Sequence, residues 1–109
     1  MSDIHDTIKE QVSTNRVVLY MKGTPQFPQC GFSATVAEVL KRCGLTEYTS
    51  FNVLQDDALR QGIKEFSNWP TVPQLYVDGE FVGGCDIVRE MAESGELQDY
   101  LKEKQIATA

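Results

Sequence analysis

The sequence has no long apolar run, no concentration of basic residues and few cysteines, and each shortage argues against a class of protein. No stretch of its 109 residues is apolar for long enough to span a bilayer. Acidic residues outnumber basic ones by 16 to 10, and the two kinds are interspersed. A phosphate-binding surface needs clustered Lys and Arg. We therefore expect no nucleic acid and no membrane among the partners.

The first residues of the sequence also lack the features of a targeting segment. Residues 1–6 are acidic and contain neither the basic start and apolar stretch of a signal peptide nor the arginines of a transit peptide. From this pattern we expect a cytoplasmic protein.

Cysteine is scarce, with only Cys30, Cys43 and Cys85. An odd count in a chain that is 41% hydrophobic does not indicate a disulfide framework, because a domain of this size can stabilise itself with a core. A reducing compartment fits this composition. At least one thiol is then free to act chemically.

Helical and strand patterns follow one another along the chain. Ser2 and Asp3 are suitable caps for a first helix that buries Ile4, Ile8 and Val12. The following segments are predicted in order: a strand over 17–21, a loop over 23–28, a helix from Cys30, a strand over 48–53, a helix opened by residues 56–57, a hairpin of 74–77 and 80–82, a helix capped by Asp86 and reaching residue 91, and a helix over 96–103.

This order predicts the fold class. Mixed helices and strands suit an α/β domain of three layers, with a central four-stranded mixed sheet flanked by helices. In the predicted helix that starts at Cys30, the residues that recur at helical spacing are Phe32, Val36, Val39, Leu40 and Cys43. We expect a single domain over residues 1–109.

Cys30 lies where a strand and a loop give way to a helix. Backbone N–H groups at a helix start lack partners within the helix, and the helix dipole adds positive potential. Both favour the thiolate, so the pKa of Cys30 should fall below that of a free thiol. Lys22, at the end of the first strand, can add a positive charge. The placement is that of a nucleophile or of a ligand for a soft metal.

The residue three positions after Cys30 is Ser33, where dithiol oxidoreductases carry a second cysteine. Serine cannot form the disulfide, which excludes a two-cysteine cycle within the motif. Cys43 lies about 20 Å further along the helix, too far for a disulfide with Cys30, and its spacing favours a core position. Cys85 precedes a helix, so both its activation and its reach to Cys30 stay open.

A lone thiol at a helix start has two chemical uses. It can exchange with a small thiol that acts as the resolving partner, or it can ligate a soft metal or an iron–sulfur cluster. A [2Fe–2S] cluster needs four ligands. One cysteine from each of two chains, with two external thiols, would complete that set.

Four segments resemble the signatures of monothiol glutaredoxins of the Cys-Gly-Phe-Ser class. They are residues 22–25 (KGTP), 30–33 (CGFS), 69–74 (WPTVPQ) and 83–86 (GGCD), in the family's order and spacing. The resemblance covers about residues 4–103 and is to the short, single-domain members. It implies a thioredoxin-like fold, glutathione as the external thiol, and a [2Fe–2S] cluster bridging a homodimer. It also implies partnership with BolA-like proteins and iron–sulfur acceptor proteins.

The resemblance assigns roles by position. Cys30 would be the nucleophile and the cluster ligand. The glutathione contacts would be Lys22, Arg60, Thr71, Val72, Cys85 and Asp86, with Lys64 a weaker candidate. Cations suit the two carboxylates of glutathione. A cis Pro73, as in the family, would turn the backbone of Val72 toward the tripeptide, while backbone N–H groups and the Asp86 carboxylate would meet its γ-glutamyl end.

The resemblance leaves several functions open. The leading hypothesis is a carrier for assembly, storage or transfer of iron–sulfur clusters. The alternatives are a glutathione-dependent oxidoreductase that deglutathionylates proteins, with weak activity at most, and a regulatory module that senses iron. All three use Cys30.

Overall fold

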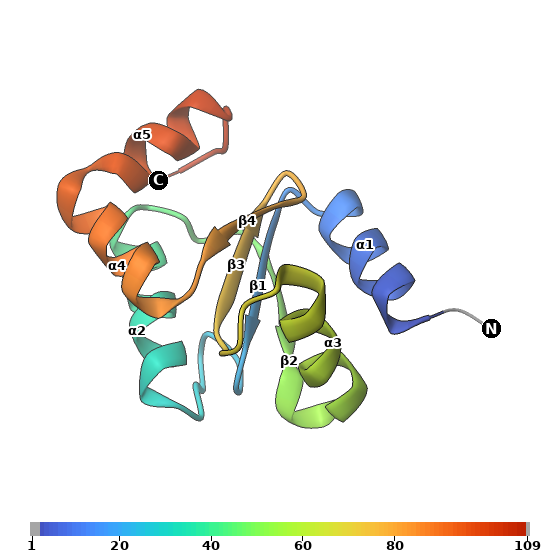
Figure 1. Ribbon diagram of the computed structural model, residues 1–109. Helices are drawn as coiled ribbons and strands as arrows, with labels where there is room; N and C mark the ends of the chain where they lie inside the picture. The colour runs from blue at the N-terminus through green and yellow to red at the C-terminus, as the bar shows by residue number, and fades with distance from the viewer. Residues whose placement is uncertain (1–2, 109) are drawn as a thin grey trace.

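The computed structural model describes residues 3–108, which fold as helices and strands in the predicted order (Figure 1). The elements are α1 (Ile4–Thr14), β1 (Val17–Met21), α2 (Gly31–Arg42), β2 (Thr49–Asn52), the short 3₁₀ helix η1 (Val53–Gln55), α3 (Asp57–Ser67), β3 (Gln74–Val77), β4 (Glu80–Gly83), α4 (Cys85–Ser94) and α5 (Glu96–Glu103).

The four strands form one mixed sheet in the order β2-β1-β3-β4. β1 pairs in parallel with β2 and antiparallel with β3, which in turn pairs antiparallel with β4. Because β1 and β2 are parallel, the segments that leave them both start at the same end of the sheet. In Figure 1 this end is at the bottom, where α2 and α3 begin.

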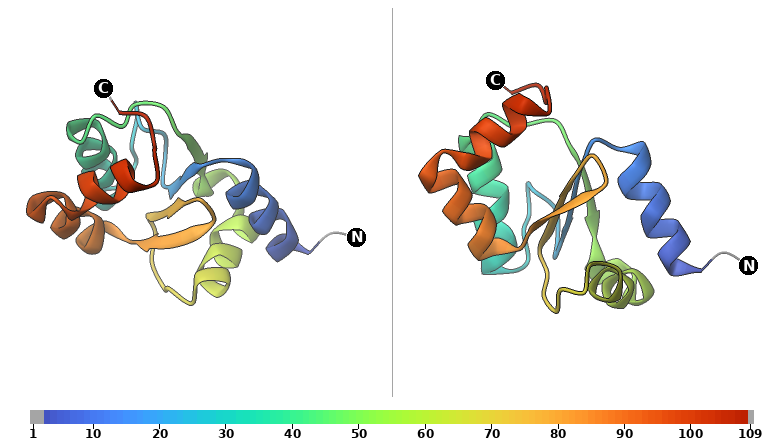
Figure 2. Two further views of the ribbon diagram at one scale, coloured as in Figure 1. Left: turned by 90° about the horizontal axis from the view of Figure 1, so that it is seen from above. Right: turned by 45° about the horizontal axis from the view of Figure 1, so that its top comes forward.

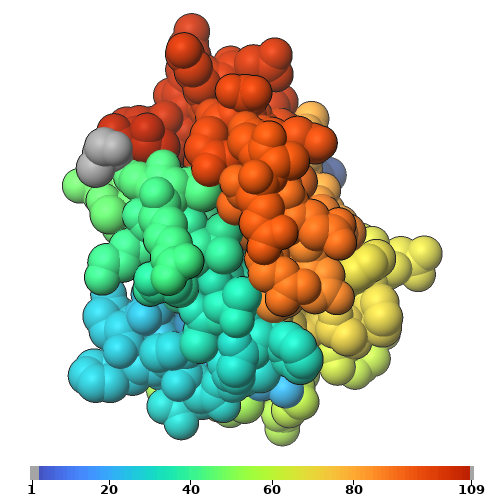
Figure 3. Space-filling view, turned by 90° about the vertical axis from the view of Figure 1, so that its left-hand side faces the viewer, coloured from blue at the N-terminus to red at the C-terminus, as the bar shows by residue number. Residues whose placement is uncertain are grey.

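Helices cover both faces of the sheet, which confirms the three-layer prediction. α1 and α3 lie on one face, while α2, α4 and α5 lie on the other (Figures 1 and 2). Figure 3 shows α2 and α4 side by side on the outer surface of the second layer. The strands β1 and β3 are fully buried and send alternate side chains into each layer. Leu19 and Leu75 belong to the core under α2 and α4, and Tyr20 and Tyr76 to the core under α1 and α3.

Local sequence signals account for most element boundaries. The carboxylate of Asp3 accepts from the N–H of His5, and that of Asp56 accepts from the N–H of Leu59 at 3.0 Å, so both helices are capped as predicted. Ser2 lies outside the described residues. The hairpin turn is also confirmed, because Asp78 and Gly79 both have positive φ, as a two-residue turn of this type requires.

The structure qualifies one helical pattern of the sequence and contradicts one predicted helix cap. Phe32 shares the helical spacing of the buried residues of α2, yet it is 63% exposed. The first turn of α2 extends beyond the core, and a surface groove lies beside it. Asp86 does not cap α4: Gly84 is the cap residue, and the helix runs on to Ser94.

Within residues 3–108, every helix is too short or too polar to cross a bilayer.

Candidate functional site

Cys30 occupies the N-cap position of α2, with extended backbone angles of φ −154° and ψ 138°. The backbone N–H of Ser33 lowers the pKa of the Cys30 thiol most, and partial burial opposes that effect. The N–H of Phe32, the charge of Lys22 and the Ser33 hydroxyl lower the pKa further. The pKa of Cys30 is therefore shifted in the predicted direction, and the main cause is the start of the helix, as predicted.

Ser33 has a structural role that the sequence did not reveal. Its side chain is fully buried, and its Oγ accepts a hydrogen bond from the backbone N–H of Lys22 at 3.0 Å. The bond ties the first turn of α2 to the end of β1. From the sequence, Ser33 indicated only that the second cysteine of a dithiol motif is absent. In the structure it also holds together the two segments that position Cys30.

The loop between β1 and α2 is closed by its own backbone. The N–H of Gln29 donates to the carbonyl of Lys22 at 2.9 Å, and Thr24 and Phe27 exchange backbone hydrogen bonds. Gly23 starts the loop with φ +89°, and a Cβ there would lie 2.5 Å from a carbonyl oxygen. Only glycine fits both the angle and the space. The loop thus delivers Cys30 to the start of α2 in a fixed position.

Asn52 secures this loop from the neighbouring strand. Its Oδ1 accepts from the N–H of Gly23 at 2.9 Å and from the N–H of Leu54 at 3.0 Å. One amide therefore joins the turns that follow β1 and β2. The sequence analysis missed Asn52, because its role depends on the parallel pairing of two distant segments.

A groove of about 240 Å³ opens beside Cys30. It gathers residues from the loop after β1, the start of α2, α3 and the loop before β3: Lys22, Cys30, Phe32, Arg60, Lys64, Pro70, Thr71 and Val72. Three of these residues are positively charged: Lys22, Arg60 and Lys64. The sequence analysis named each of them as a candidate for binding glutathione, and all three line the same groove as the thiol. Such a site suits a ligand that carries a carboxylate.

The groove continues on the other side of Phe32, Thr71 and Val72, which line both parts. The second part, of about 170 Å³, is lined by Phe32, Trp69, Thr71, Val72, Pro73, Cys85 and Asp86. All the site residues predicted from the sequence thus lie along one surface, with cations at one end and Asp86 at the other.

The loop that separates the two ends is held by Gln74, another residue whose role the sequence did not show. Its fully buried side chain donates from Nε2 to the carbonyls of Trp69 at 3.2 Å and Thr71 at 3.1 Å. The hydroxyl of Tyr76 donates to its Oε1 at 2.9 Å. The Val72–Pro73 bond is cis, as the resemblance implied.

Cys85 begins α4, and it is not an activated thiol. Partial burial raises its pKa most, followed by the charge of Asp86, and a negative charge on Cys30 raises it further. Both Cys30 and Cys85 are free thiols here. The Asp86 carboxylate is largely exposed and lies 3.3 Å from the guanidinium of Arg89. Cys30 is therefore the more reactive of the two thiols.

Gly84 allows α4 to approach the cis-proline loop. A Cβ on Gly84 would lie 2.9 Å from Nε1 of Trp69 and 3.3 Å from the carbonyl oxygen of Pro73. A larger residue would push the start of α4 away from the groove.

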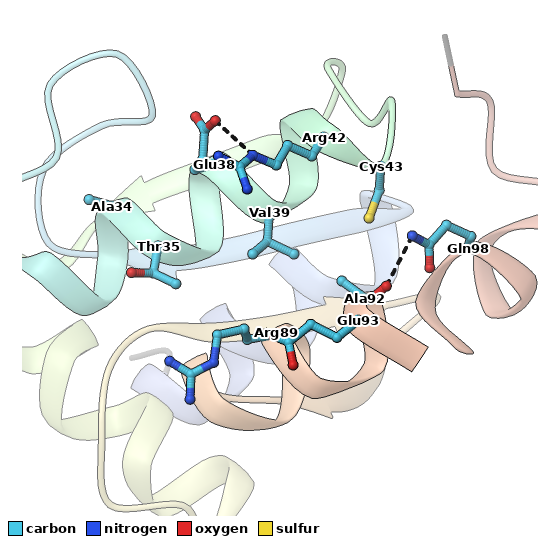
Figure 4. Close-up of a pocket in the computed structure, with 10 residues that line it drawn as sticks. All are labelled: Ala34, Thr35, Glu38, Val39, Arg42, Cys43, Arg89, Ala92, Glu93 and Gln98. Carbon is cyan, nitrogen blue, oxygen red and sulfur yellow. Dashed lines mark hydrogen bonds and ion pairs between the residues drawn. The ribbon is translucent and has the colours of Figure 1, made fainter. Parts of the chain in front are cut away.

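Cys43 lies away from this site. It ends α2, packs beside the core, and points its sulfur into a separate surface pocket of about 510 Å³ between α2, α4 and α5 (Figure 4). Burial raises the pKa of this thiol. The prediction that Cys43 cannot partner Cys30 agrees with its free thiol and its separate pocket.

The arrangement offers one reactive thiolate rather than a complete metal site. Among residues 3–108, no three His, Cys, Asp or Glu side chains are grouped so that they could hold a metal ion. Cys30 can attack a disulfide or donate one sulfur ligand.

Comparison with known proteins gives consistent matches. The glutaredoxin family matches residues 17–82. The chain is 51% identical over 106 residues to monothiol glutaredoxin-5, mitochondrial, of Saccharomyces cerevisiae, covering 95% of this chain and 71% of that protein. It is 51% identical over 102 residues to glutaredoxin-related protein 5, mitochondrial, of Danio rerio (94% and 66%). It is 52% identical over 97 residues to probable monothiol glutaredoxin 2 of Rickettsia typhi (89% and 86%).

Solved structures agree with the thioredoxin-like architecture. The solution structure of reduced poplar apo GrxS14 superposes with a TM-score of 0.78 at 51% identity, covering 94% of this chain and 93% of that one. A crystal structure of a buckwheat glutaredoxin–glutathione complex superposes with a TM-score of 0.78 at 25% identity, covering 92% and 88%.

The relatives contradict the expected cytoplasmic location. The yeast and zebrafish proteins are named as mitochondrial, and so is that of Lachancea kluyveri, at 50% identity. These names favour a mitochondrial or organellar location. The expectation rested on the first few residues of the sequence alone, and the composition of a folded domain does not identify its compartment.

Proposed function

Because this chain belongs to the glutaredoxin family and is a monothiol glutaredoxin, we propose that it binds glutathione beside Cys30 and carries [2Fe–2S] clusters for assembly, storage or transfer. The observation that supports this most is the single thiolate of Cys30 in a cationic groove, with Ser33 buried where a second cysteine would stand.

The charges along the groove support glutathione as its ligand, because cations lie at one end and Asp86 lies at the other. In the proposed pose, Lys22 and Arg60 face the glycine carboxylate. The backbone of Val72 pairs with the cysteine of the tripeptide in the manner of an added strand. The start of α4 receives the γ-glutamyl carboxylate, and Asp86 accepts from its ammonium group. This orientation directs the glutathione sulfur toward Cys30.

The proposed cluster is a cargo that this chain cannot hold alone. Cys30 supplies one sulfur, and the raised pKa and partial burial of Cys85 make it a poor second ligand. Two chains, each with one glutathione, would provide the four thiolates that a [2Fe–2S] cluster needs. The thiolate of Cys30 would form the bond between the protein and the cluster. The positive charge of Lys22 would offset the negative charge of that thiolate. BolA-like and acceptor proteins are proposed partners on the family resemblance alone.

The lowered pKa of Cys30 also favours a second function, thiol–disulfide exchange with glutathione. The thiolate would attack the glutathione sulfur of a protein–glutathione disulfide and release the protein thiolate. A second glutathione would then attack the Cys30–glutathione disulfide, releasing oxidised glutathione and restoring Cys30. The same groove serves both functions, so the site does not separate them.

Anaerobic reconstitution separates the two functions. The protein is mixed with iron, sulfide and glutathione, and visible absorbance, iron per chain and mass are measured. The carrier hypothesis predicts a coloured dimer that is lost without glutathione and in Cys30→Ser, but retained in Cys85→Ser. A colourless monomer that rapidly reduces a glutathione mixed disulfide would refute the carrier function and support the oxidoreductase.

A further inference from the structure

Gln74 places an amide in the core, where water cannot reach it. Apart from tyrosines, only Ser33 and Gln74 among residues 3–108 are polar and fully buried. Burying an amide costs free energy unless its polar atoms are paired. Here Nε2 donates to the carbonyls of Trp69 and Thr71, and Oε1 accepts from the Tyr76 hydroxyl. An amide suits this arrangement, because it carries two donors on one terminal atom and an acceptor on the other.

The loop before β3 is also held at its start, by the end of α3. The N–H of Trp69 donates to the carbonyl of Lys64 and to Oγ of Ser67, both at 3.1 Å. Its carbonyl accepts from Gln74 at 3.2 Å. The loop therefore cannot turn its Trp69 and Thr71 carbonyls outward without leaving buried polar groups unpaired, which is costly.

Val72 follows these two anchored residues and lines both parts of the groove. Among residues 3–108, no group forms a hydrogen bond with its backbone N–H or C=O. The Thr71–Val72 bond is trans, since the cis bond lies after Val72. In a planar trans peptide the C=O and the N–H point in opposite directions. Because the Thr71 carbonyl is held toward the buried amide of Gln74, the Val72 N–H points away from the core.

We propose that Gln74 is a positioning residue for glutathione: by holding the Thr71 carbonyl inside the protein, it keeps the Val72 N–H directed into the groove, where it meets the cysteine backbone of the tripeptide. This rests on the glutathione binding proposed above. The loop has this arrangement before the ligand arrives, so binding need not order it. Gln74 thereby favours thiols with a peptide backbone over thiols without one. It lines neither part of the groove, so it acts without touching the ligand.

A second glutamine–tyrosine pair provides a matched control. The hydroxyl of Tyr20 donates to Oε1 of Gln11 at 2.7 Å, as that of Tyr76 donates to Oε1 of Gln74 at 2.9 Å. The two tyrosine rings pack edge to face, with centroids 5.6 Å apart, in the core under α1 and α3. Gln11 belongs to α1 and lines neither part of the groove. The two pairs share their chemistry and their layer, but only one of them holds the loop.

The test compares two disulfides that Cys30 can attack. Oxidised glutathione carries a peptide backbone, and hydroxyethyl disulfide carries none. In either reaction the Cys30 thiolate attacks one sulfur, a mixed disulfide forms, and the other half leaves as a thiolate. Both second-order rate constants are read from the mass of the Cys30 peptide. They are measured for the unaltered protein, Gln74→Met, Tyr76→Phe, Gln11→Met and Tyr20→Phe, at a temperature where thermal unfolding shows each variant to be folded.

Gln74→Met keeps a side chain of similar length but removes both donors. It should lower the preference for oxidised glutathione over hydroxyethyl disulfide about tenfold, the worth of about one hydrogen bond. Tyr76→Phe should lower it about threefold, because the amide keeps its donors and loses only the hydroxyl that orients it. The rate with hydroxyethyl disulfide should stay the same, since the causes that lower the pKa of Cys30 lie in α2 and Lys22.

The control variants should separate stability from selectivity. Gln11→Met and Tyr20→Phe each remove one side of a tyrosine–glutamine hydrogen bond, so both should unfold at a lower temperature. Their preference for oxidised glutathione should equal that of the unaltered protein, because neither residue contacts the loop before β3.

The possible failures can be told apart. If the unaltered protein prefers oxidised glutathione and Gln74→Met retains that preference, Gln74 does not position the ligand and the glutathione function stands. Equal slowing with both disulfides leads to the same conclusion, because it marks a purely structural role. If the unaltered protein shows no preference, the proposed glutathione binding fails, and this proposal fails with it. Should Gln74→Met not fold, the comparison of Tyr76→Phe with Tyr20→Phe decides, and equal preferences in those two variants refute the proposal.

Discussion

Replacing Ser33 by alanine tests the two roles that the structure gives this residue. The Ser33 hydroxyl is fully buried and accepts from the backbone N–H of Lys22 at 3.0 Å. Alanine leaves that N–H without a partner, which costs about 1–3 kcal/mol. For a domain of this size, that corresponds to a fall in Tm of roughly 4–20 °C. Thermal and urea unfolding of the apo protein measure this loss.

The pKa of Cys30 should respond much less than the stability. The largest cause of its lowered pKa is the backbone N–H of Ser33, which alanine retains, and the hydroxyl is the smallest cause. In Ser33→Ala the pKa of Cys30 should rise slightly and stay below that of an ordinary thiol. The rate of alkylation at Cys30 against pH, read from the mass of the Cys30 peptide, reports this value.

Thr35→Ala is the matched control for the hydroxyl. Thr35 Oγ1 donates to the carbonyl of Gly31 at 3.0 Å in the same turn of α2, but its side chain is not fully buried. Its loss should change the free energy of unfolding by no more than about 0.5 kcal/mol. An unchanged stability of Ser33→Ala, or a return of the Cys30 pKa to the ordinary value, would refute the reasoning.

Three further predictions concern the loop, the other thiol and a distant ion pair. Gly23→Ala should destabilise the protein and slow alkylation of Cys30, because φ of +89° and a 2.5 Å approach to a carbonyl leave no room for a Cβ; unfolding and alkylation rates measure both. Near neutral pH, Cys30 should be alkylated faster than Cys85, because the first pKa is lowered and the second raised; equal rates in peptide mass spectra would contradict this. Arg16→Gln should destabilise the protein near neutral pH, because the Arg16 guanidinium lowers the pKa of Asp78. That ionic contribution is present above the pKa of an unfolded Asp, about 3.9, and is lost as the pH falls through the lower folded value, so the difference in urea stability should narrow in acid.

Local rules were sufficient for the helices, the strands and the position of Cys30. Caps such as Asp56 and turns such as Asp78-Gly79 act over a few residues, so their signals can be read without the rest of the chain. They did not show that Phe32 is exposed, and they failed for the Asp86 cap. Whether a helical side chain is buried depends on what lies beside it, and the cap of α4 depends on how Gly83 and Gly84 bring the chain away from the sheet.

The sequence by itself determined the chemistry that this protein can perform. One thiol at a helix start, with serine three residues later, excludes a dithiol cycle in that motif and predicts a lowered pKa, because both effects arise within a single helical turn. Only the tertiary structure decided what surrounds that thiol. The parallel pairing of β1 and β2 lets Asn52 lock the loop before Cys30, and the burial of Ser33 and Gln74 holds the two sides of the groove. The exposure of Phe27, Phe32 and Leu54 is likewise decided by the tertiary structure, because a large apolar side chain stays exposed only where no other element packs over it.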